Sequence, residues 1–285
     1  MTTPWGAEVP RLSPTCAKIL LERSAKAAWE YHRLGGAAES EDSDAKERGR
    51  IMDRLLLGVG PEIVVCRVVK ADGQPATDWK TKAAQEFRDA VAADGKIPIM
   101  AAKLAGYEKI ISAWKTALKA QGIELSGQSQ VKVDWESDGV PCRGKLDHLI
   151  IAPDAASAVI IDLKSVDVAS DGATDRVVVT YDYATQVAAY VEGIETNWPD
   201  AAGRVEFKLA FCETSAPYDV NVRPLGGEAK EYGERRWRRA KRLWGECLRT
   251  GVFPGYAGGN PVKVSAFKLA EEMDTDMGTN PGVDF

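Results

Sequence analysis

The middle of the chain changes from helical to extended periodicity, and this change limits the possible folds more than any other feature. The segments "QSQVKVDWE", "CRGKLDHLIIA" and "SAVIIDLKS" alternate or form short apolar runs, which predicts three consecutive strands. Asp138-Gly139 and Pro153-Asp154 supply turn residues between them, so we expect antiparallel hairpins. Beyond an amphipathic segment, "YDYATQVAAYVEGI", the segments "RVEFKLAFCE" and "PYDVNVRPL" predict two more strands.

Helices are predicted on both sides of these strands. Ser13-Pro14 has the pattern of an N-cap followed by a first-turn proline, and it predicts a helix from about 14 to 33. "RGRIMDRLLLG" predicts a short helix, and the β-branched segment 62–70 predicts a strand. A polar loop around Asp171-Gly172 is expected before the amphipathic segment. Further helical patterns cover about 78–93, 99–121 and 228–249. This mixture predicts one α/β domain with a mixed central sheet covered by helices.

The composition excludes several classes of protein. With 37 Lys+Arg against 42 Asp+Glu in 285 residues, the chain is not a basic-tail nucleic-acid binder. Its five cysteines are scattered without a Cys-x-x-Cys pair, which argues against a zinc ribbon and an iron–sulfur cluster. The two histidines leave little room for a Ser-His-Asp triad. Neither a signal peptide nor a membrane span is predicted, so we expect a cytosolic protein.

One cluster of residues combines the groups that a divalent cation needs. Asp162-Leu163-Lys164 stands at the end of an apolar strand, and Asp147 at the end of the strand before it. Residues i and i+2 of a strand project from the same face, so the carboxylate and the ammonium of the tripeptide point into one space. Asp147 would complete a hard oxygen site of the kind that Mg²⁺ prefers, with Lys164 facing the attacking water.

The tripeptide pattern alone is weak evidence for a metal site, because acidic-x-Lys occurs six times in the chain. An ion pair at the end of a strand would explain Asp162 and Lys164 equally well. Only Asp162 has a carboxylate on a preceding hairpin strand. Gln186 and Tyr190 follow one helical turn apart at the border of an apolar stripe. The glutamine could bind a ligated water or a phosphate, although a surface glutamine and a core tyrosine are the plainer interpretation. His148 and His32 are expected to be packed or solvated rather than catalytic.

Positive charge gathers in two places. Arg143 and Lys145 share the strand face of Asp147 by alternation, so they could contact a phosphate beside the metal. The long helix carries a basic face opposite a buried stripe of Trp237, Ala240, Trp244 and Leu248. This face either neutralises phosphates or is a solvated, charge-rich surface. Its members are Arg235, Arg236, Arg238, Arg239, Lys241 and Arg242.

These motifs together resemble a known family. The run "CRGKLDHLIIAP…AVIIDLKSV…YDYATQVAAYVEG" resembles the core of PD-(D/E)XK nucleases, most closely the phage and prophage RecE-like exonucleases of the exodeoxyribonuclease VIII type. "LSPTCAKILLERSAKAAWEYHRLGG", "GRIMDRLLLG" and "TGVFPGY" resemble further segments of that family. The resemblance spans most of residues 11 to 256, and the order and spacing of the motifs make it specific.

The resemblance implies a restriction-endonuclease-like α/β core with a mixed central β-sheet flanked by helices and an N-terminal helical extension. It implies an N-terminal region over 1–122, a nuclease core over 123–256 and a tail over 257–285. Asp147, Asp162 and the carbonyl of Leu163 would bind the metal, Lys164 would be the catalytic lysine, and Gln186 with Tyr190 would form the helix motif beside the site. Asp53, from the N-terminal region, stands where the family usually has histidine and can also ligate Mg²⁺. Arg143, Lys145, Arg235, Arg238, Arg239 and Arg242 would bind DNA.

The implied activity is a Mg²⁺-dependent exonuclease, with Mn²⁺ able to substitute, that degrades one strand of linear double-stranded DNA from its 5′ end. The resemblance also implies a ring-like homo-oligomer that cooperates with a single-strand annealing protein in phage-type recombination, in the cytoplasm of a bacterial host and without membrane contact. One alternative is a related endonuclease or a Cas4-like single-strand nuclease, although the missing cysteine cluster weighs against the latter. Another is a catalytically weakened DNA-binding or scaffold protein with the same fold.

Overall fold

A mixed five-stranded sheet forms the centre of the molecule. The computed structural model describes residues 8–35, 44–258, 264–266, 268 and 270. The strand order is β3-β4-β5-β6-β7, in which β5 and β6 are parallel and the other neighbours antiparallel. The strands are β3 Gln128–Ser137, β4 Val140–Ile151, β5 Ala158–Val166, β6 Val205–Glu213 and β7 Val220–Arg223. The predicted α/β core with a mixed sheet is therefore confirmed.

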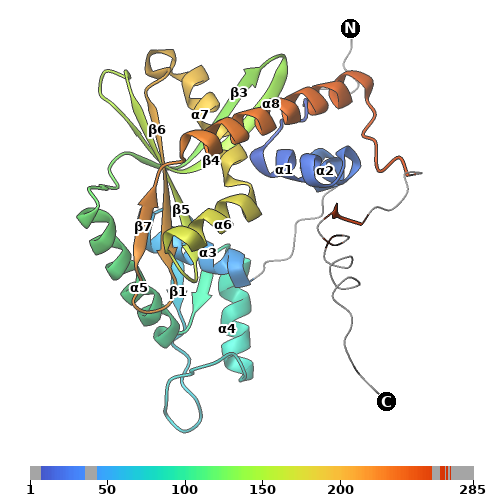
Figure 1. Cartoon of the computed structure of the whole chain (residues 1–285). Coiled ribbons are helices and arrows are strands. Elements are labelled where there is room, and N and C mark those ends of the chain that lie inside the picture. Colours follow the sequence, from blue (N-terminus) through green and yellow to red (C-terminus); the bar gives the residue numbers. More distant parts are fainter. Residues whose placement is uncertain (1–7, 36–43, 259–263, 267, 269, 271–285) are drawn as a thin grey trace, which may run out of the picture.

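Helices cover both faces of this sheet (Figure 1). Ile160 and Ile161 are adjacent in β5 and enter different apolar clusters, because neighbouring side chains of a strand point to opposite faces. The first cluster includes α1 Pro14–Glu22, α2 Ala25–Tyr31, α7 Tyr183–Asn197 and α8 Gly227–Thr250. The second includes α3 Asp44–Leu57 and α5 Ala101–Ala120. The sheet is thus buried between two helical layers, which protects polar groups placed along its strands.

The remaining elements are small. A parallel pair, β1 Ile63–Val65 and β2 Ile97–Ile99, packs near α4 Lys82–Ala93, and α6 Asp171–Tyr181 precedes α7. Two short 3₁₀ turns complete the described elements, η1 Arg33–Gly35 and η2 Pro199–Ala201. In the part of the chain that the structure describes, no helix is both long and apolar enough to cross a membrane.

Three local predictions were wrong. The helix expected over 14–33 is broken after α1, because Ser24 starts a new N-cap whose Oγ accepts the N–H of Ala27 at 3.1 Å. The loop expected around Asp171-Gly172 is helical over α6, although its Val-Val-Val run is a poor helix former. The strand expected over 62–70 shortens to β1. The Ser13 cap of α1 is confirmed, with Oγ accepting the N–H of Cys16 at 3.2 Å.

A short N-terminal segment lies along one half of β4. The β4–β5 register ends at the pair His148 and Ile161, so the first half of β4 has no partner in β5. There Leu12 donates its N–H to the carbonyl of Pro141 at 2.8 Å and accepts the N–H of Arg143 at 2.9 Å. This parallel bridge takes the place of a strand.

Candidate active site

Asp147 lies where β4 separates from its neighbours. The β3–β4 register passes from the pair Ser129–His148 to the pair Val131–Leu146, so Asp147 is left out of the ladder. Opposite it, Gln130 has a left-handed backbone with φ of 55°. The break frees the carboxylate to bond along the sheet, and its Oδ2 accepts the N–H of Leu163 in β5 at 2.9 Å. Asp147 is therefore fixed against the strand that carries Asp162.

Asp162 and Lys164 point to the same face of the sheet and meet α7 there. Nζ of Lys164 lies 2.5 Å from Oδ2 of Asp162, whose residue is only 2% exposed. Gln186 joins both, because its Nε2 donates to Oδ1 of Asp162 at 3.0 Å and its Oε1 accepts from Lys164 at 3.3 Å. The alternation of β5 and the helix motif on α7 thus place these three side chains in one cluster.

Tyr190 holds the backbone of β4 rather than the carboxylates. Its hydroxyl donates to the carbonyl of Lys145 at 2.9 Å, two residues before Asp147. Its ring covers Gly144, where a Cβ would lie 2.7 Å from Cε1 of the tyrosine. Burial raises the pKa of Tyr190 to about 12, so it remains a neutral phenol and can donate this bond. Its place in the site is to position the strand.

Asp53 lies at the edge of the site. Its Oδ2 accepts a hydrogen bond from Nε2 of Gln130 at 3.2 Å. Burial raises the pKa of Asp53, while the charge of Lys145 lowers it. Its own charge in turn contributes to raising the pKa of Asp147. The N-terminal region therefore does deliver a third carboxylate to this neighbourhood.

The cluster holds more negative charge than its surroundings compensate. Burial and then the charge of Asp162 raise the pKa of Asp147 to about 7, although Lys164 and the N–H of Leu163 oppose the rise. Burial lowers the pKa of Lys164, but Asp162 and Asp147 more than offset this and raise it overall. The lysine is therefore an ammonium at neutral pH, and the carboxylate pair favours a further cation.

The donor set fits a hard divalent cation. Oδ2 of Asp162 is buried and lies beside the ammonium of Lys164, but it accepts no hydrogen bond from the described residues. Among residues 8–35, 44–258 and the few described beyond them, no three His, Cys, Asp or Glu side chains are grouped as a complete metal site. Mg²⁺ is commonly held by one or two carboxylates, with waters and substrate phosphates completing the octahedron. The carboxylates of Asp147 and Asp162 match that requirement, and the Leu163 carbonyl stays a predicted third ligand.

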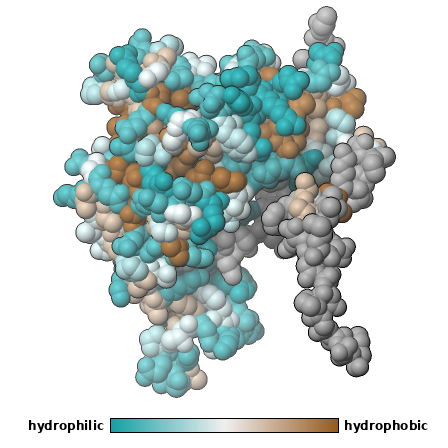
Figure 2. All heavy atoms as spheres, viewed as in Figure 1, coloured by the Kyte–Doolittle hydropathy of each residue, from teal (hydrophilic) through white to brown (hydrophobic). Residues whose placement is uncertain are grey.

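The predicted basic residues lie in two separate places. Arg143 and Lys145 line a cavity of about 620 Å³ together with Lys132 and Tyr190, the tyrosine that holds the backbone of β4 two residues before Asp147. The basic residues of α8 line a cavity of about 850 Å³ at the β3–β4 turn. They are Arg235, Arg238, Arg239, Lys241, Arg242 and Arg249. Eight residues of β4 separate that turn from Asp147, which is about 25 Å. In the view of Figure 2 the surface over the middle of α8 is largely hydrophilic.

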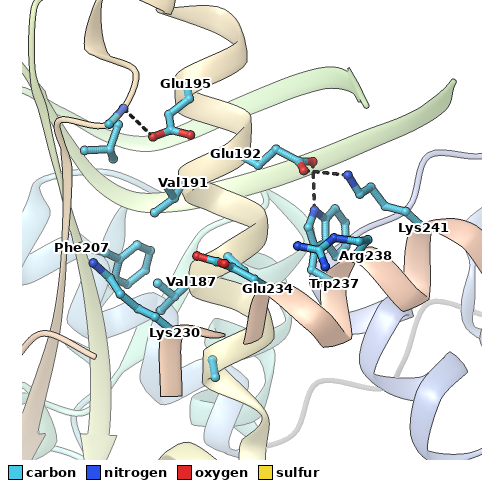
Figure 3. Close-up of a pocket in the computed structure, with 14 residues that line it drawn as sticks. Val187, Val191, Glu192, Glu195, Phe207, Lys230, Glu234, Trp237, Arg238 and Lys241 are labelled. Carbon is cyan, nitrogen blue, oxygen red and sulfur yellow. Dashed lines mark hydrogen bonds and ion pairs between the residues drawn. The ribbon is translucent and has the colours of Figure 1, made fainter. Parts of the chain in front are cut away.

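Two members of the basic face predicted on α8 form internal ion pairs instead of an exposed charged surface. Arg236 binds Asp182 at the junction of α6 and α7, with Nη2 2.9 Å from Oδ2. Lys241 is 4% exposed and lies 2.7 Å from Glu192 and 2.8 Å from Asp138. Figure 3 shows Glu192 between Lys241 and the indole of Trp237. These two cations fasten α8 to α7 and to the β3–β4 turn.

The histidines lie outside the cluster, as predicted. The ring of His148 contacts Oγ of Ser129 and the carbonyl of Ser126, and His32 contacts the carbonyl of Arg11. The sequence interpretation missed Tyr183, whose ring centroid lies 4.3 Å from Nζ of Lys164. Its position one helical turn before Gln186 was the available signal.

Comparisons with known proteins identify the fold and the family of the chain. A search of curated proteins finds no match. A solved structure named "Putative exonuclease" from Eubacterium rectale is similar over 91% of this chain and 92% of its own, with 18% identity and a TM-score of 0.57, so the two share a fold. A structure named SSO0001 covers 73% of this chain and 95% of its own at 12% identity, but its TM-score is only 0.28.

A family model matches residues 68–262, which include β3 to β7, α7 and α8 and both carboxylates of the cluster. The prediction of a PD-(D/E)XK protein is thereby confirmed, while the RecE-like specificity stays a prediction. The chain belongs to the family described as "PDDEXK-like domain of unknown function (DUF3799)".

Proposed function

We propose that this chain is a metal-dependent exonuclease that hydrolyses one strand of linear double-stranded DNA from its 5′ end. One observation carries the proposal, namely the cluster of Asp147, Asp162 and Lys164 on neighbouring strands with Gln186 bonded to two of them. A PDDEXK-like domain supports a nuclease in general. The choice of exonuclease rests on the RecE-like motifs, and the name of the Eubacterium rectale protein agrees with it.

The proposed chemistry divides between the cation and the chain. A bound Mg²⁺ or Mn²⁺ polarises a phosphate and lowers the pKa of a bound water. Asp147, Asp162 and the Leu163 carbonyl would hold it. Lys164 keeps its proton at neutral pH and would donate to the water or to a phosphate oxygen, offsetting developing charge. Gln186 fixes the amine and the carboxylate relative to each other.

DNA would contact two separate groups of basic residues on the chain. Arg143 and Lys145 would bind phosphates next to the reacting one, because they precede Asp147 by four and two residues on β4 and line a cavity with Tyr190. The arginines of α8 that gather at the β3–β4 turn would bind phosphates about seven base pairs further along, because that turn is about 25 Å from Asp147. A ring-like homo-oligomer and a single-strand annealing partner belong to the same proposal through the RecE-like resemblance.

The test compares linear and circular duplex DNA, with Mg²⁺, Mn²⁺ or EDTA. We expect metal-dependent loss of the linear form only, and release of a 5′ label before a 3′ label. Cutting of circles would support the endonuclease alternative, and binding without cutting would support the scaffold alternative. Asp162→Asn should lower the rate by at least about 100-fold, since the amide removes a ligand charge.

The chain contains a matched control for this substitution. Glu206 and Lys208 form the same acidic-x-Lys pattern on the neighbouring strand β6, with their charged atoms 3.3 Å apart, and Glu206 is largely exposed. Glu206→Gln should therefore leave digestion unchanged. Equal activity of Asp162→Asn and Glu206→Gln would remove the assignment of the site.

A further inference from the structure

Two tyrosines flank the junction of α6 and α7 and stack on each other. Asp182 has a left-handed backbone there, with φ of 55°, so the chain turns sharply between the helices. The rings of Tyr181 and Tyr183 lie 5.7 Å apart with 19° between their planes. The turn is held by Arg236, which donates to both carboxylate oxygens of Asp182. The pair is therefore fixed in place rather than free to rotate apart.

The pair connects the reacting groups with the surface. Tyr183 is half-buried, and its ring centroid lies 4.3 Å from Nζ of Lys164. Tyr181 is 55% exposed, and Nζ of Lys18 lies 5.3 Å from its ring centroid. Lys18 also donates to the carbonyl of Thr180 at 3.1 Å. An ammonium, two aromatic rings and a second ammonium thus follow one another from the cluster to solvent.

α1 connects the basic cavity with the tyrosine pair. Its N-cap Ser13 and its first two residues, Pro14 and Thr15, border the cavity of Arg143 and Lys145, and Lys18 is one helical turn further along the same helix. α1 therefore extends from the basic cavity to Tyr181. A DNA strand that follows α1 would meet the phosphate-binding cations first and the two aromatic rings next.

The segment between β5 and α7 is also unusually apolar at its surface. Three of the ten large hydrophobic side chains exposed in the described residues belong to it, and they are Val168, Val179 and Tyr181. Because exposed apolar side chains can mark interaction sites, this segment is expected to be covered in use. The only face of Tyr181 that is protected by another ring is the one against Tyr183, within the described residues.

We propose that Tyr181 and Tyr183 form a stacking platform for an unpaired nucleobase at the end of the DNA strand whose phosphate lies at Lys164. This inference rests on the proposed nuclease function and adds the state of its substrate, a terminal nucleotide released from its base pair. Stacking on a tyrosine tolerates any base, since every base has a π-face, so it suits an enzyme that advances along any sequence. The flexible amine of Lys18 can swing from the ring to the next phosphate.

The test uses the full chain and a duplex with 2-aminopurine at its terminal nucleotide and phosphorothioate linkages that resist cleavage. We expect binding to quench the terminal probe and to leave a probe placed inside the duplex unchanged. Tyr181→Phe keeps the quenching. Tyr181→Ala loses it and weakens binding about tenfold, in line with the loss of one stacked base. Tyr256→Ala, at another exposed tyrosine, changes neither.

Tyr181→Leu separates stacking from packing, because leucine keeps apolar contacts with Lys18 but has no aromatic face. Loss of quenching in the leucine variant, with an unchanged circular dichroism spectrum, supports the platform. Quenching that survives in the leucine or alanine variant overturns it. Digestion of unmodified linear DNA by the wild type is measured in parallel. Digestion without quenching refutes the platform alone, whereas absence of digestion refutes the proposed function whatever the probe reports.

Discussion

Replacing Asp147 by asparagine should remove activity and at the same time stabilise the fold at alkaline pH. The side chains have the same size, and the amide oxygen can still accept the N–H of Leu163. What changes is a buried charge beside a second carboxylate, Asp162. Active sites often retain such unfavourable groups because function requires them. The variant should therefore lose a metal ligand and gain stability of the fold.

The magnitude follows from the pKa. In the folded chain the pKa of Asp147 rises from 3.8 to about 7, so the folded state holds the proton more tightly than the unfolded state. Stability is then lost as pH rises from about 4 to about 7, at about 1.36 kcal/mol per pH unit, which sums to about 4 kcal/mol. For a chain of this length, about 4 kcal/mol corresponds to about 7 °C in Tm.

The assay is thermal or urea unfolding in EDTA between pH 4 and 8.5. We expect the Tm of Asp147→Asn to be higher than that of the wild type by up to about 7 °C at pH 8.5, and the two Tm values to be equal near pH 4. Addition of Mg²⁺ should raise the Tm of the wild type and leave the Tm of the variant unchanged. Asp134→Asn, with a side chain 62% exposed, is the control and should show no such pH dependence. A variant that is equally or less stable than the wild type at every pH would refute the reasoning.

Three further predictions concern the helices that support the site. Gly233→Ala should destabilise the fold by about 1 to 3 kcal/mol, because its Cβ would overlap the carbonyl of Ala184 and force α8 from α7, as urea unfolding would show. Lys241→Met should lower the free energy of unfolding by about 3 to 5 kcal/mol by leaving Glu192 without its cation, and Lys230→Met, at an exposed lysine about three turns earlier on α8, should not. Arg239→Ala with Arg242→Ala should reduce the slope of log binding against log salt by about 2, whereas an unchanged slope would place DNA elsewhere.

The part of the site that depends on periodicity could be predicted from the sequence. Alternation along β5 puts Asp162 and Lys164 on one face of the sheet. Helical spacing puts Gln186 on the face of α7 that contacts Asp162. The hairpin turns at Asp138-Gly139 and Pro153-Asp154 fix the strand order, which brings Asp147 next to β5. These are local rules, and nothing in the fold overrides them.

The features that the sequence did not reveal depend on contacts between distant segments. Arg236 and Lys241 share a helix with exposed arginines, and only the positions of Asp182 and Glu192 make them internal ion pairs. The Val-Val-Val run of α6 is helical because Val177 and Val178 pack against the sheet cluster, which outweighs their weak propensity. The break in β4 at Asp147 likewise needs the left-handed Gln130 on another strand.

The bridge between Leu12 and Cys142 has a practical consequence for work with the protein. Where the pairing of β4 with β5 ends, the backbone groups of Pro141 and Arg143 would form an open sheet edge if the segment before α1 were absent. Open edges recruit strands from other molecules. A shortened version that starts at the Ser13 cap would keep every helix and every carboxylate of the site, yet we expect it to aggregate on concentration, whereas one that retains Leu12 should stay dispersed.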